Sequence, residues 1–544
     1  MKSESFFKGT LILISANAIS KILGAILKIP LTYILGEQGM AIYQTSFSVY
    51  IMLLSLITSG LPFALSRYIS QEFTLKRYGN IRFAVKLSIL IMAVSGLIGS
   101  LIMFFGADFF ALSMKDPKAT FAIKAISPSV FFVAIGCVYK SCYQGYARQT
   151  PSAISQVIEA FVKLVAGFLL ASAFSAFSVK YASGAAIFGV TIGEAVATLV
   201  LFLFYVPYRK ILRSEKRSHS RRKIAKGMVS VMIPMTACAV VSSLLGLWDT
   251  SVIRSGLTNI CFSPEEAESF IALYSPYTKL FDSIKQGGKL TFDGARWLFG
   301  AYSGYAATVF NLPSGILASF GVAILPVVCS SIASKNQERL TKTVSAAAKT
   351  VLLISLPCAL TMCFFSKEIL YILFKNTASY MMLSLMAPIL IFSTLSQFLC
   401  SVLHSSGNIM TPFKYMTVCN LIKIGLTFLL IPIPKLNILG AIIASLLANV
   451  IYFILNFLRI RKDFAITPVT FDDFGKVLLS AFIMVLTAYL ILEPATAFAK
   501  NIYVGFFAAM FVGLLAYALS LILFGAVKKE EITHFLNRSS KNGQ

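Results

Sequence analysis

The sequence is short of charge, and above all of acidic residues. Only 13% of its 544 residues are charged and 57% are hydrophobic, whereas a soluble protein is roughly 25% charged. A soluble chain of this length folds as several domains, each with a polar surface to cover, and this chain has too few charges to cover them. The composition therefore excludes a soluble multidomain protein, as well as the disordered, collagen-like and disulfide-scaffold classes. It predicts an all-α polytopic membrane protein.

Residues that carry catalytic or metal chemistry are also scarce. The three histidines are far apart, at His219, His404 and His534, and the nine cysteines form no Cys-x-x-Cys pair. The sequence has no spacing typical of a metal site, no Walker A motif and no Gly-x-Ser-x-Gly or His-Glu-x-x-His motif. We therefore expect no enzyme, no cofactor and no metal.

Long apolar runs fill most of the chain. A helix needs about 20 mostly apolar residues to cross a bilayer, and a window of that length predicts fourteen membrane-spanning helices. The predicted spans are 10–35, 40–66, 84–113, 122–145, 153–176, 182–207, 228–253, 301–333, 345–365, 378–403, 415–434, 438–458, 477–497 and 502–526.

Lysine and arginine outnumber aspartate and glutamate by 48 to 22, a formal charge of +26, and most of the surplus follows even-numbered spans. The densest basic run follows span 6 and reads RKILRSEKRSHSRRKIAK (209–226). The positive-inside rule places these connections, and both termini, in the cytoplasm. We interpret the basic run as a topogenic loop that touches anionic membrane lipids, and we expect no nucleic-acid partner.

One connection, residues 255–300, is long, polar and predicted to be extracytoplasmic. Ser263, Pro264 and Glu266 within it match a helix start with a cap, a first-turn proline and a capping-box acid. The stretch is too polar to cross the membrane. We expect one or two amphipathic helices that lie at the outer surface.

The two halves of the chain resemble each other at offsets of 256–264 residues. The matching stretches are LPFALSRYIS (61–70) with LPVVCSSIAS (325–334), QGYARQTP (144–151) with SGNIMTP (406–412), and GAAIFG (184–189) with GAIIAS (440–445). The offset carries odd-numbered spans onto odd-numbered spans, so the repeat is parallel. Such repeats are typical of alternating-access transporters, whose substrate site lies between the halves.

The repeat predicts the domain organisation. We expect a six-helix bundle in 1–208 and a second, parallel six-helix bundle in 228–460, which carries the insertion 255–300. The basic cytoplasmic loop 209–227 joins the bundles, and 461–544 holds two extra membrane helices and a tail.

Span 1 carries the most informative charges. Asn17, Lys21, Gly24 and Lys28 fall at i, i+4, i+7 and i+11, which is one face of a helix. Ionisable residues inside a membrane are costly and by default mark a functional site or an internal pair. We interpret this stripe as a cavity wall that contacts an anion. The alternative is that each lysine pairs with a carboxylate from another span.

Five other charged residues lie in or at the ends of predicted spans. Glu159 and Lys163 form an i, i+4 pair that either neutralises itself or lines a cavity. Glu194 has no partner in its own helix, so it is either a protonatable coupling site or, as we favour, the counter-ion to a lysine of span 1. Asp249 and Arg254 are candidates for the cavity wall of the second half, although Arg254 could equally reach outward to the membrane surface.

Three stretches identify a family resemblance: FFKGTLILISANAISKILGAILKIPLTYILGEQGMAIYQ (6–44), YQGYARQTPSAISQVIEAFVK (143–163) and SGYAATVFNLPSGI (303–316). They resemble the stage V sporulation protein B and polysaccharide-biosynthesis branch of the multidrug, oligosaccharidyl-lipid and polysaccharide exporter superfamily. The match runs through about residues 1–460. It implies a twelve-helix core with two extra helices, and flipping of an undecaprenyl-diphosphate-linked saccharide across the bacterial plasma membrane.

Lipid II flippases belong to the same superfamily, and this chain departs from their pattern. They carry arginines on the first helix. Lys21 matches one of these, whereas the second position is Leu27, with Lys28 one residue on. On span 8, where they carry an arginine and an acid, this chain has Thr308 and Asn311. Because lysine lacks the bidentate grip of arginine on phosphate, lipid II is one candidate among related glycans. Asn311 either binds sugar hydroxyls or holds helices together.

The sequence thus predicts that Lys21 and Lys28, helped by Asn17 and Arg254, hold the diphosphate of a lipid-linked anionic saccharide. Two alternatives stay open. One is a cation-coupled multidrug exporter of the same superfamily, which requires an acidic cavity. The other is a non-transporting membrane scaffold in envelope assembly, which requires no polar stripe on an internal face. Envelope-synthesis proteins are further candidate partners.

Overall fold

A computed structural model gives the fold of the chain. It describes residues 6–526 except 59, 75–76, 147, 212–219, 275–283, 285–286, 318–327, 329–336, 407 and 409. In these residues the chain is helical apart from turns and one antiparallel pair of two-residue strands, β1 (Cys261–Phe262) and β2 (Gly288–Lys289). The prediction of an all-α membrane protein is confirmed, because helices satisfy their own backbone hydrogen bonds where no water is present.

The helices fall into three groups along the chain. The first group is α1 (Phe6–Thr58), α2 (Leu61–Thr74), α3 (Tyr78–Phe105), α4 (Ala107–Ser113), η1 (Pro117–Ala119), α5 (Thr120–Gly145), α6 (Thr150–Phe174) and α7 (Val179–Ile211). Next come α8 (Arg221–Thr258), α9 (Pro264–Leu273), α10 (Phe292–Ala301), the π-helical turn η3 (Tyr302–Ala306) and a helix over 307–317. The last group is α12 (Gln337–Phe364), α13 (Ser366–Phe374), α14 (Tyr380–Ser405), α15 (Met410–Leu430), α16 (Ile438–Phe464), α17 (Phe471–Ala499) and α18 (Ile502–Leu523).

Eleven helices among the described residues are long and apolar enough to cross a membrane. Ten of them correspond one to one with predicted spans, and the eleventh, Ile26–Thr58, joins predicted spans 1 and 2. Predicted span 7 lies within α8. Much of predicted span 8, from 318 onward, falls outside the described residues, as does 212–219 of the predicted basic loop.

Helix α1 bends at Gly36, the point where predicted spans 1 and 2 divide. Gly36 has φ 62° and ψ −174°, and this breaks α1 into two helical segments over 6–35 and 37–58. A positive φ is a conformation that glycine adopts without the steric cost other residues pay. Pro30 lies one and a half turns earlier and loosens the same region of the helix.

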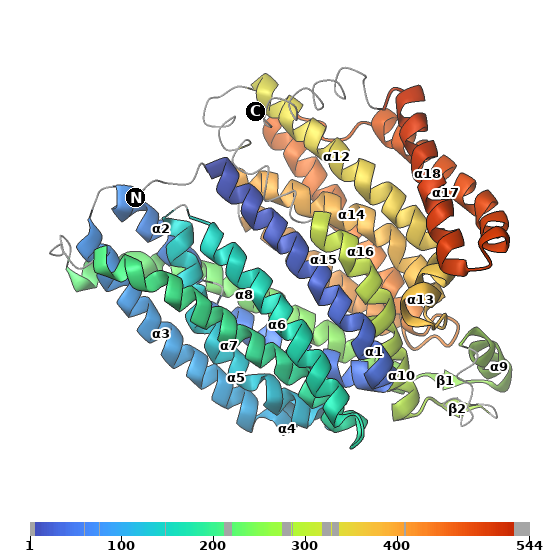
Figure 1. Ribbon diagram of the computed structural model, residues 1–544, viewed down its shortest axis with the longest axis horizontal. Helices are drawn as coiled ribbons and strands as arrows, with labels where there is room; N and C mark the ends of the chain where they lie inside the picture. The colour runs from blue at the N-terminus through green and yellow to red at the C-terminus, as the bar shows by residue number, and fades with distance from the viewer. Residues whose placement is uncertain are drawn as a thin grey trace. The chain divides into compact units, whose positions relative to one another are not determined.

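The chain divides into two compact units. Unit 1 comprises Met1–Ser319 and Met416–Ala444, and unit 2 comprises Phe320–Tyr415 and Ser445–Gln544. Apolar side chains fill each core. Fully buried examples are Leu31, Ile123, Leu65 and Val138 in unit 1, and Leu352, Leu399 and Ala481 in unit 2. Within unit 2, α17 and α18 form an antiparallel pair (Figure 1). The bundle boundaries predicted from the repeat, at 1–208 and 228–460, stay a prediction.

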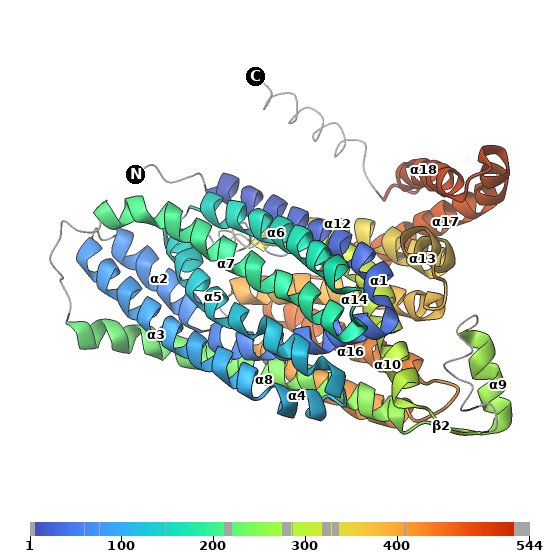
Figure 2. The same cartoon turned by 60° about the horizontal axis from the view of Figure 1, so that its bottom comes forward.

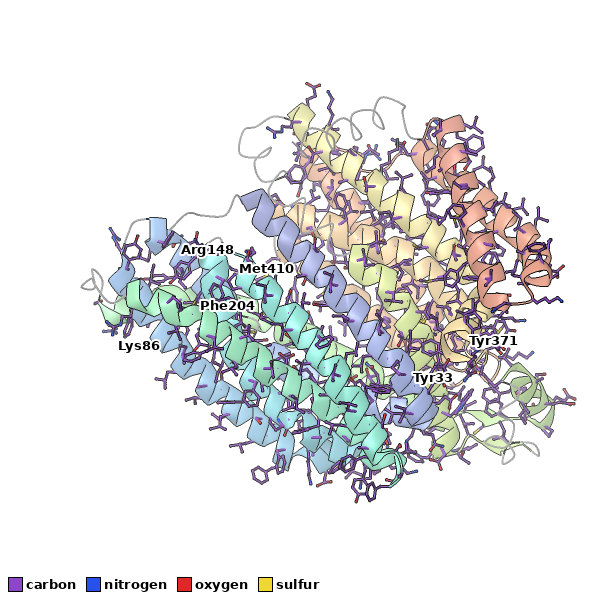
Figure 3. All side chains as sticks on the ribbon, in the orientation of Figure 1. Tyr33, Lys86, Arg148, Phe204, Tyr371 and Met410 are labelled. Carbon is purple, nitrogen blue, oxygen red and sulfur yellow. The ribbon has the colours of Figure 1, made fainter. Side chains whose placement is uncertain are left out.

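Within unit 1, α5, α6 and α7 lie side by side (Figures 1 and 2). Glycines bring α6 and α7 close together: a Cβ atom on Gly189 would lie 2.5 Å from the backbone nitrogen of Gly167. A Cβ atom on Gly193 would lie 2.5 Å from Cγ of Lys163, so this glycine leaves room for the lysine stem. The outer surface of the helices is apolar, as expected of a lipid-facing surface, and Phe204 of α7 is one exposed example (Figure 3).

Two basic residues of unit 1 lie toward the same end of its helices. They are Lys86 near the start of α3 and Arg148 just after α5, whereas Tyr33 of α1 lies toward the other end (Figure 3). These two positions agree with the alternation that the positive-inside rule uses, although Lys115 and Lys118 lie in the connection between α4 and α5. The side of the membrane that this end meets stays a prediction.

The predicted capping box at the start of α9 is confirmed. The backbone N–H of Glu266 donates to Oγ of Ser263 at 3.4 Å, and the backbone N–H of Ser263 donates to Oε2 of Glu266 at 3.0 Å. The hydroxyl of Ser263 also donates to Oε2 at 2.9 Å, and these bonds hold the pKa of Glu266 below its usual value. Because the pKa of Glu266 is lowered, its ionised carboxylate stabilises the helix start at pH values above the ordinary pKa of glutamate. This stabilisation is lost as the pH falls through the lowered pKa of Glu266.

Removal of the cap is expected to loosen α9. Ser263→Ala deletes the oxygen that accepts from Glu266 and should cost the helix about 1 kcal/mol. Hydrogen exchange of the amides in 264–273 should then be faster than in the parent chain. Ser269→Ala serves as the matched control, because its hydroxyl donates to the carbonyl of Glu265 and caps nothing. Equal exchange in the two variants would contradict the capping assignment.

The second part of the insertion differs from the prediction of a surface helix. Residues 294–301 of α10 are buried, and Trp297 is 1% exposed. The segment turns apolar after Asp293, so it packs into unit 1 and leads directly into η3 and the helix over 307–317. Only its first turn, capped by Thr291, is exposed.

Candidate functional site

The first segment of α1 has three distinct faces. Asn17, Gly24 and Lys28 lie on one face and are half-buried or exposed. Ile19, Ile26 and Tyr33 are exposed on the opposite face, about 180° away at 100° per residue. Between these two faces, the side chains of Ala16 and Leu27 are buried against the rest of unit 1.

This arrangement is what a helix needs if it borders lipid on one side and a polar space on the other. The apolar face marked by Tyr33 (Figure 3) suits acyl chains. The polar face carries an amide, a glycine with no atom within 4 Å of a Cβ position, and an ammonium group. The side chain of Lys21 lies outside the described residues, so its place on this face stays a prediction.

A cluster of four charged side chains, of which Glu194 is buried and the other three are partly buried, joins α5, α6 and α7. Nζ of Lys163 lies 2.5 Å from Oε1 of Glu159, the i, i+4 contact that the sequence predicts, and 2.7 Å from Oε1 of Glu194. Nζ of Lys140, on α5, lies 3.5 Å from Oε2 of Glu159. Two carboxylates therefore balance two ammonium groups within a low-dielectric region, where an unpaired charge would be costly.

The partner of Glu194 in the structure is thus Lys163 of the adjacent helix α6. The sequence favoured a lysine of the first helix. Because Glu194 and Lys163 are 31 residues apart, only the packing of α6 on α7 reveals the pair. Lys140 was not among the predicted site residues, although its apolar surroundings on span 4 were a signal.

A second intramembrane pair lies elsewhere in unit 1. Nζ of Lys423 on α15 lies 2.7 Å from Oδ2 of Asp249 on α8. Asp249 was a candidate for a cavity wall, and in the structure its charge is balanced by this lysine. Lys163 and Lys423 are 260 residues apart (423 − 163), which falls within the offset of the sequence repeat. Both bind a carboxylate from another helix.

Arg254 lies in a third cluster and does not reach outward to the membrane surface. Its side chain is 5% exposed, and Nη2 lies 2.9 Å from Oδ2 of Asp116, whose side chain is fully buried. Arg296 of α10 contacts the other carboxylate oxygen, with Nη2 2.9 Å from Oδ1. The guanidinium of Arg254 also lies over the ring of Phe299, 5.1 Å from its centroid. The alternative that Arg254 reaches outward to the membrane surface is therefore wrong. The buried carboxylate of Asp116 balances the charge that water would otherwise solvate.

Asp116 and Arg296 were missed by sequence reasoning. Asp116 sits in a short polar connection that reads as a solvated turn, and Arg296 precedes a tryptophan in an apolar helix. An arginine inside an apolar run was the available signal. Asn311 is exposed on the helix over 307–317. Among the residues that the structure describes, no group of three histidine, cysteine, aspartate or glutamate side chains could hold a metal ion.

The fold is shared with solved structures of membrane transporters. The chain has the fold of a lipid II flippase MurJ in an inward closed conformation, with a TM-score of 0.63, 18% identity, and 94% of this chain and 98% of the other covered. A multidrug resistance MATE family transporter of the MOP superfamily in an outward-facing conformation matches with a TM-score of 0.60 and 14% identity, over 85% of this chain and 96% of the other.

The particular family follows from the sequence. The family model described as polysaccharide biosynthesis protein matches residues 6–330, more than half of the chain, and the lipid II flippase MurJ model matches 300–513. The chain belongs to the polysaccharide biosynthesis protein family. Stage V sporulation protein B of Bacillus subtilis (strain 168) is 24% identical over 547 residues, covering 98% of each chain. Lipid II flippase MurJ of the same organism is 23% identical, covering 85% of this chain and 83% of that protein.

Proposed function

We propose that this protein flips an undecaprenyl-diphosphate-linked saccharide across the bacterial plasma membrane by alternating access. The observation that carries the proposal is the polar face of α1, on which Asn17 and Lys28 lie opposite an apolar face. A lipid-linked diphosphate needs both: cationic and amide groups for its headgroup, and contact with the bilayer for its tail. Lys21 is assigned to the same face from its spacing, and Asn311 is a further candidate for sugar hydroxyls.

The family membership supports this proposal. Relatives that match nearly the whole chain or most of it carry the names stage V sporulation protein B and lipid II flippase. Lipid II is the polyprenyl-diphosphate saccharide that the second of these names suggests as substrate. The ammonium group of lysine is a compact point charge. It can bind a diphosphate without the fixed bidentate geometry that the planar guanidinium of arginine imposes.

The charged clusters argue against the alternative of a cation-coupled multidrug exporter. A binding site for cationic drugs or coupling ions needs carboxylates that are available to a ligand. The three acids predicted inside spans, Glu159, Glu194 and Asp249, each lie within 2.7 Å of a lysine Nζ atom. Their charges are therefore already balanced by the protein itself.

A reconstitution experiment tests the proposed substrate class. Proteoliposomes would be loaded with a fluorescent undecaprenyl-diphosphate disaccharide, and in parallel with an uncharged glycolipid on the same tail. We expect protein-dependent movement of the diphosphate lipid between leaflets and none of the neutral one. Transport of a cationic dye by the same vesicles, without movement of the diphosphate lipid, would instead support the exporter.

The orientation proposed here places the N-terminus, the C-terminus and the basic loop 209–227 in the cytoplasm. The support is the excess of lysine and arginine in connections after even-numbered spans. In this orientation the insertion that contains α9 and α10 lies on the outer side. The headgroup then enters from the side that carries most of the basic residues.

A further inference from the structure

Asp116 lies at the centre of a buried cluster drawn from four parts of unit 1. Arg296 of α10 donates to Oδ1 through Nε at 3.1 Å and through Nη2 at 2.9 Å. Arg254 of α8 contacts Oδ2 at 2.9 Å. Arg254 also donates through Nη1 to the hydroxyl of Thr45 on α1, and that hydroxyl in turn donates to the carbonyl of Ala41 at 2.8 Å. Two guanidinium groups thus converge on one small carboxylate.

The buried part of this cluster has more positive than negative charge. Arg254 and Arg296 are each 4% exposed, and Asp116 is fully buried. The second acid, Asp293, has a side chain that is 52% exposed, and it is shared between Arg296 at 2.7 Å and Lys118 at 3.5 Å. Solvent therefore screens much of its charge. Two buried arginines that face one buried carboxylate form a site suited to an anion with more than one negative charge.

The chemistry of the two arginines matches phosphate as well as carboxylate. Guanidinium groups bind both through parallel N–H···O bonds, and a diphosphate offers more acceptor oxygens and more charge than a single aspartate. The chain segment that carries Asp116 is also under local strain. Lys115, immediately before it, has φ 52°, a left-handed conformation that costs a non-glycine residue of order 1 kcal/mol. Withdrawal of Asp116 would allow this strain to relax.

We propose that Asp116 is a resident carboxylate that occupies a two-arginine anion site, and that a diphosphate group displaces it from Arg254 and Arg296. The inference rests on the proposed function for its substrate class. It makes Arg254 a substrate ligand, as the sequence suggested, but only after Asp116 leaves. In the structure, Asp116 and its two arginine partners link α1, α8 and α10. Displacement of Asp116 by the diphosphate breaks these links.

The test uses inorganic pyrophosphate and the purified full-length chain. In Asp116→Asn the two arginines lose their resident anion, so the affinity for pyrophosphate, measured by isothermal titration calorimetry, should rise at least tenfold over the parent chain. Adding Arg254→Gln or Arg296→Gln to this variant should remove the gain. An affinity unchanged by Asp116→Asn, or a gain that survives both arginine substitutions, would overturn the proposal.

A milder pair of variants covers the case in which Asp116→Asn does not fold. Thr45→Val removes the hydroxyl that accepts from Arg254 and donates to Oδ2 of Asp116 at 3.5 Å. It therefore weakens the resident arrangement and should raise pyrophosphate affinity by severalfold. Thr191→Val is the matched control, because its hydroxyl donates to the carbonyl of Ala125 and is remote from the arginines in sequence and contacts. Equal affinities in the two threonine variants would also overturn the proposal.

The outcome is separable from that of the proposed function. Pyrophosphate binding needs no lipid, no vesicle and no translocation. If Asp116→Asn gains affinity while the reconstituted chain moves no diphosphate lipid, the anion site stands and the proposed transport fails. If the chain moves the lipid and Asp116→Asn gains nothing, the anion site alone fails.

Discussion

Lys28→Glu is expected to abolish flipping of a diphosphate-linked saccharide while leaving expression and membrane insertion intact. The substitution puts a carboxylate where the proposed site needs a cation. At a distance of about 4 Å and an effective dielectric constant of about 20, the repulsion from one phosphate charge costs about 4 kcal/mol. That energy corresponds to about a thousandfold in rate. The measurement is leaflet exchange of the fluorescent lipid in proteoliposomes.

Two variants control for the loss of a lysine and for a change of net charge. Lys28→Arg keeps the cation and should retain most of the activity. Lys86→Glu makes the same charge reversal on the exposed surface of α3 and should flip lipid at the parent rate (Figure 3). Normal flipping by Lys28→Glu would remove α1 from the proposed site, as would an equal loss in Lys86→Glu.

Lys163→Met is expected to destabilise the protein by about 3–5 kcal/mol, the typical cost of breaking a buried ion pair by removing one partner. The variant leaves the carboxylates of Glu159 and Glu194 facing each other with only Lys140 nearby, at 3.5 Å from Glu159. With an unfolding entropy of about 2.1 cal/mol/K per residue over 544 residues, this loss of stability should lower the melting temperature of the purified chain in detergent by about 3–4 °C. Circular dichroism at 222 nm follows the loss of helix.

Matched variants identify the cause of that loss. Lys124→Met removes a lysine from α5 whose partner Asp108 is exposed at a 3.5 Å separation, and such pairs are worth about 0–1 kcal/mol. It should leave the melting temperature almost unchanged. Adding Glu194→Gln to Lys163→Met should recover part of the stability, because it removes the charge that was left unpaired. A Lys163→Met variant that melts with the parent would show that the cluster carries no stabilising energy.

Much of the fold was predictable because membrane helices are specified locally. Apolar length gave the spans, and the break between spans 1 and 2 fell at Gly36, where the backbone needs a positive φ. The start of α9 followed from Ser263 and Glu266, whose bonds span only three residues. The prediction that residues 292–301 lie at the outer surface is wrong for most of this segment. The residues follow a polar stretch in the sequence, and their burial depends on helices elsewhere in unit 1.

The charged clusters were only partly predictable because their members are distant in the chain. Glu159 with Lys163 follows from helical spacing, and the structure contains that pair. Asp249 with Lys423 joins residues 174 apart, and Arg296 with Asp116 joins residues 180 apart. Single residues of these pairs stood out as charges in apolar segments. Their partners emerge only from packing, which one sequence does not specify.

The charge on the first helix bears on how transport is driven. Lys28 lies on the polar face of α1, and its spacing predicts that Lys21 lies on the same face. We propose that this cationic charge couples transport to the membrane potential, which is worth about 2.3 kcal/mol per charge per 100 mV. An empty cationic carrier would be drawn toward a negative cytoplasmic side, and a bound diphosphate would nearly neutralise it for the outward step.

The most direct test of the account is the rate of diphosphate-lipid flipping in proteoliposomes under an imposed potential. Potassium gradients with valinomycin would set the cytoplasmic face of the protein negative, neutral or positive. We predict protein-dependent flipping that is fastest with the cytoplasmic face negative and is absent in Lys28→Glu at every potential. Movement of the diphosphate lipid no faster than in protein-free vesicles, at all three potentials, would contradict the account.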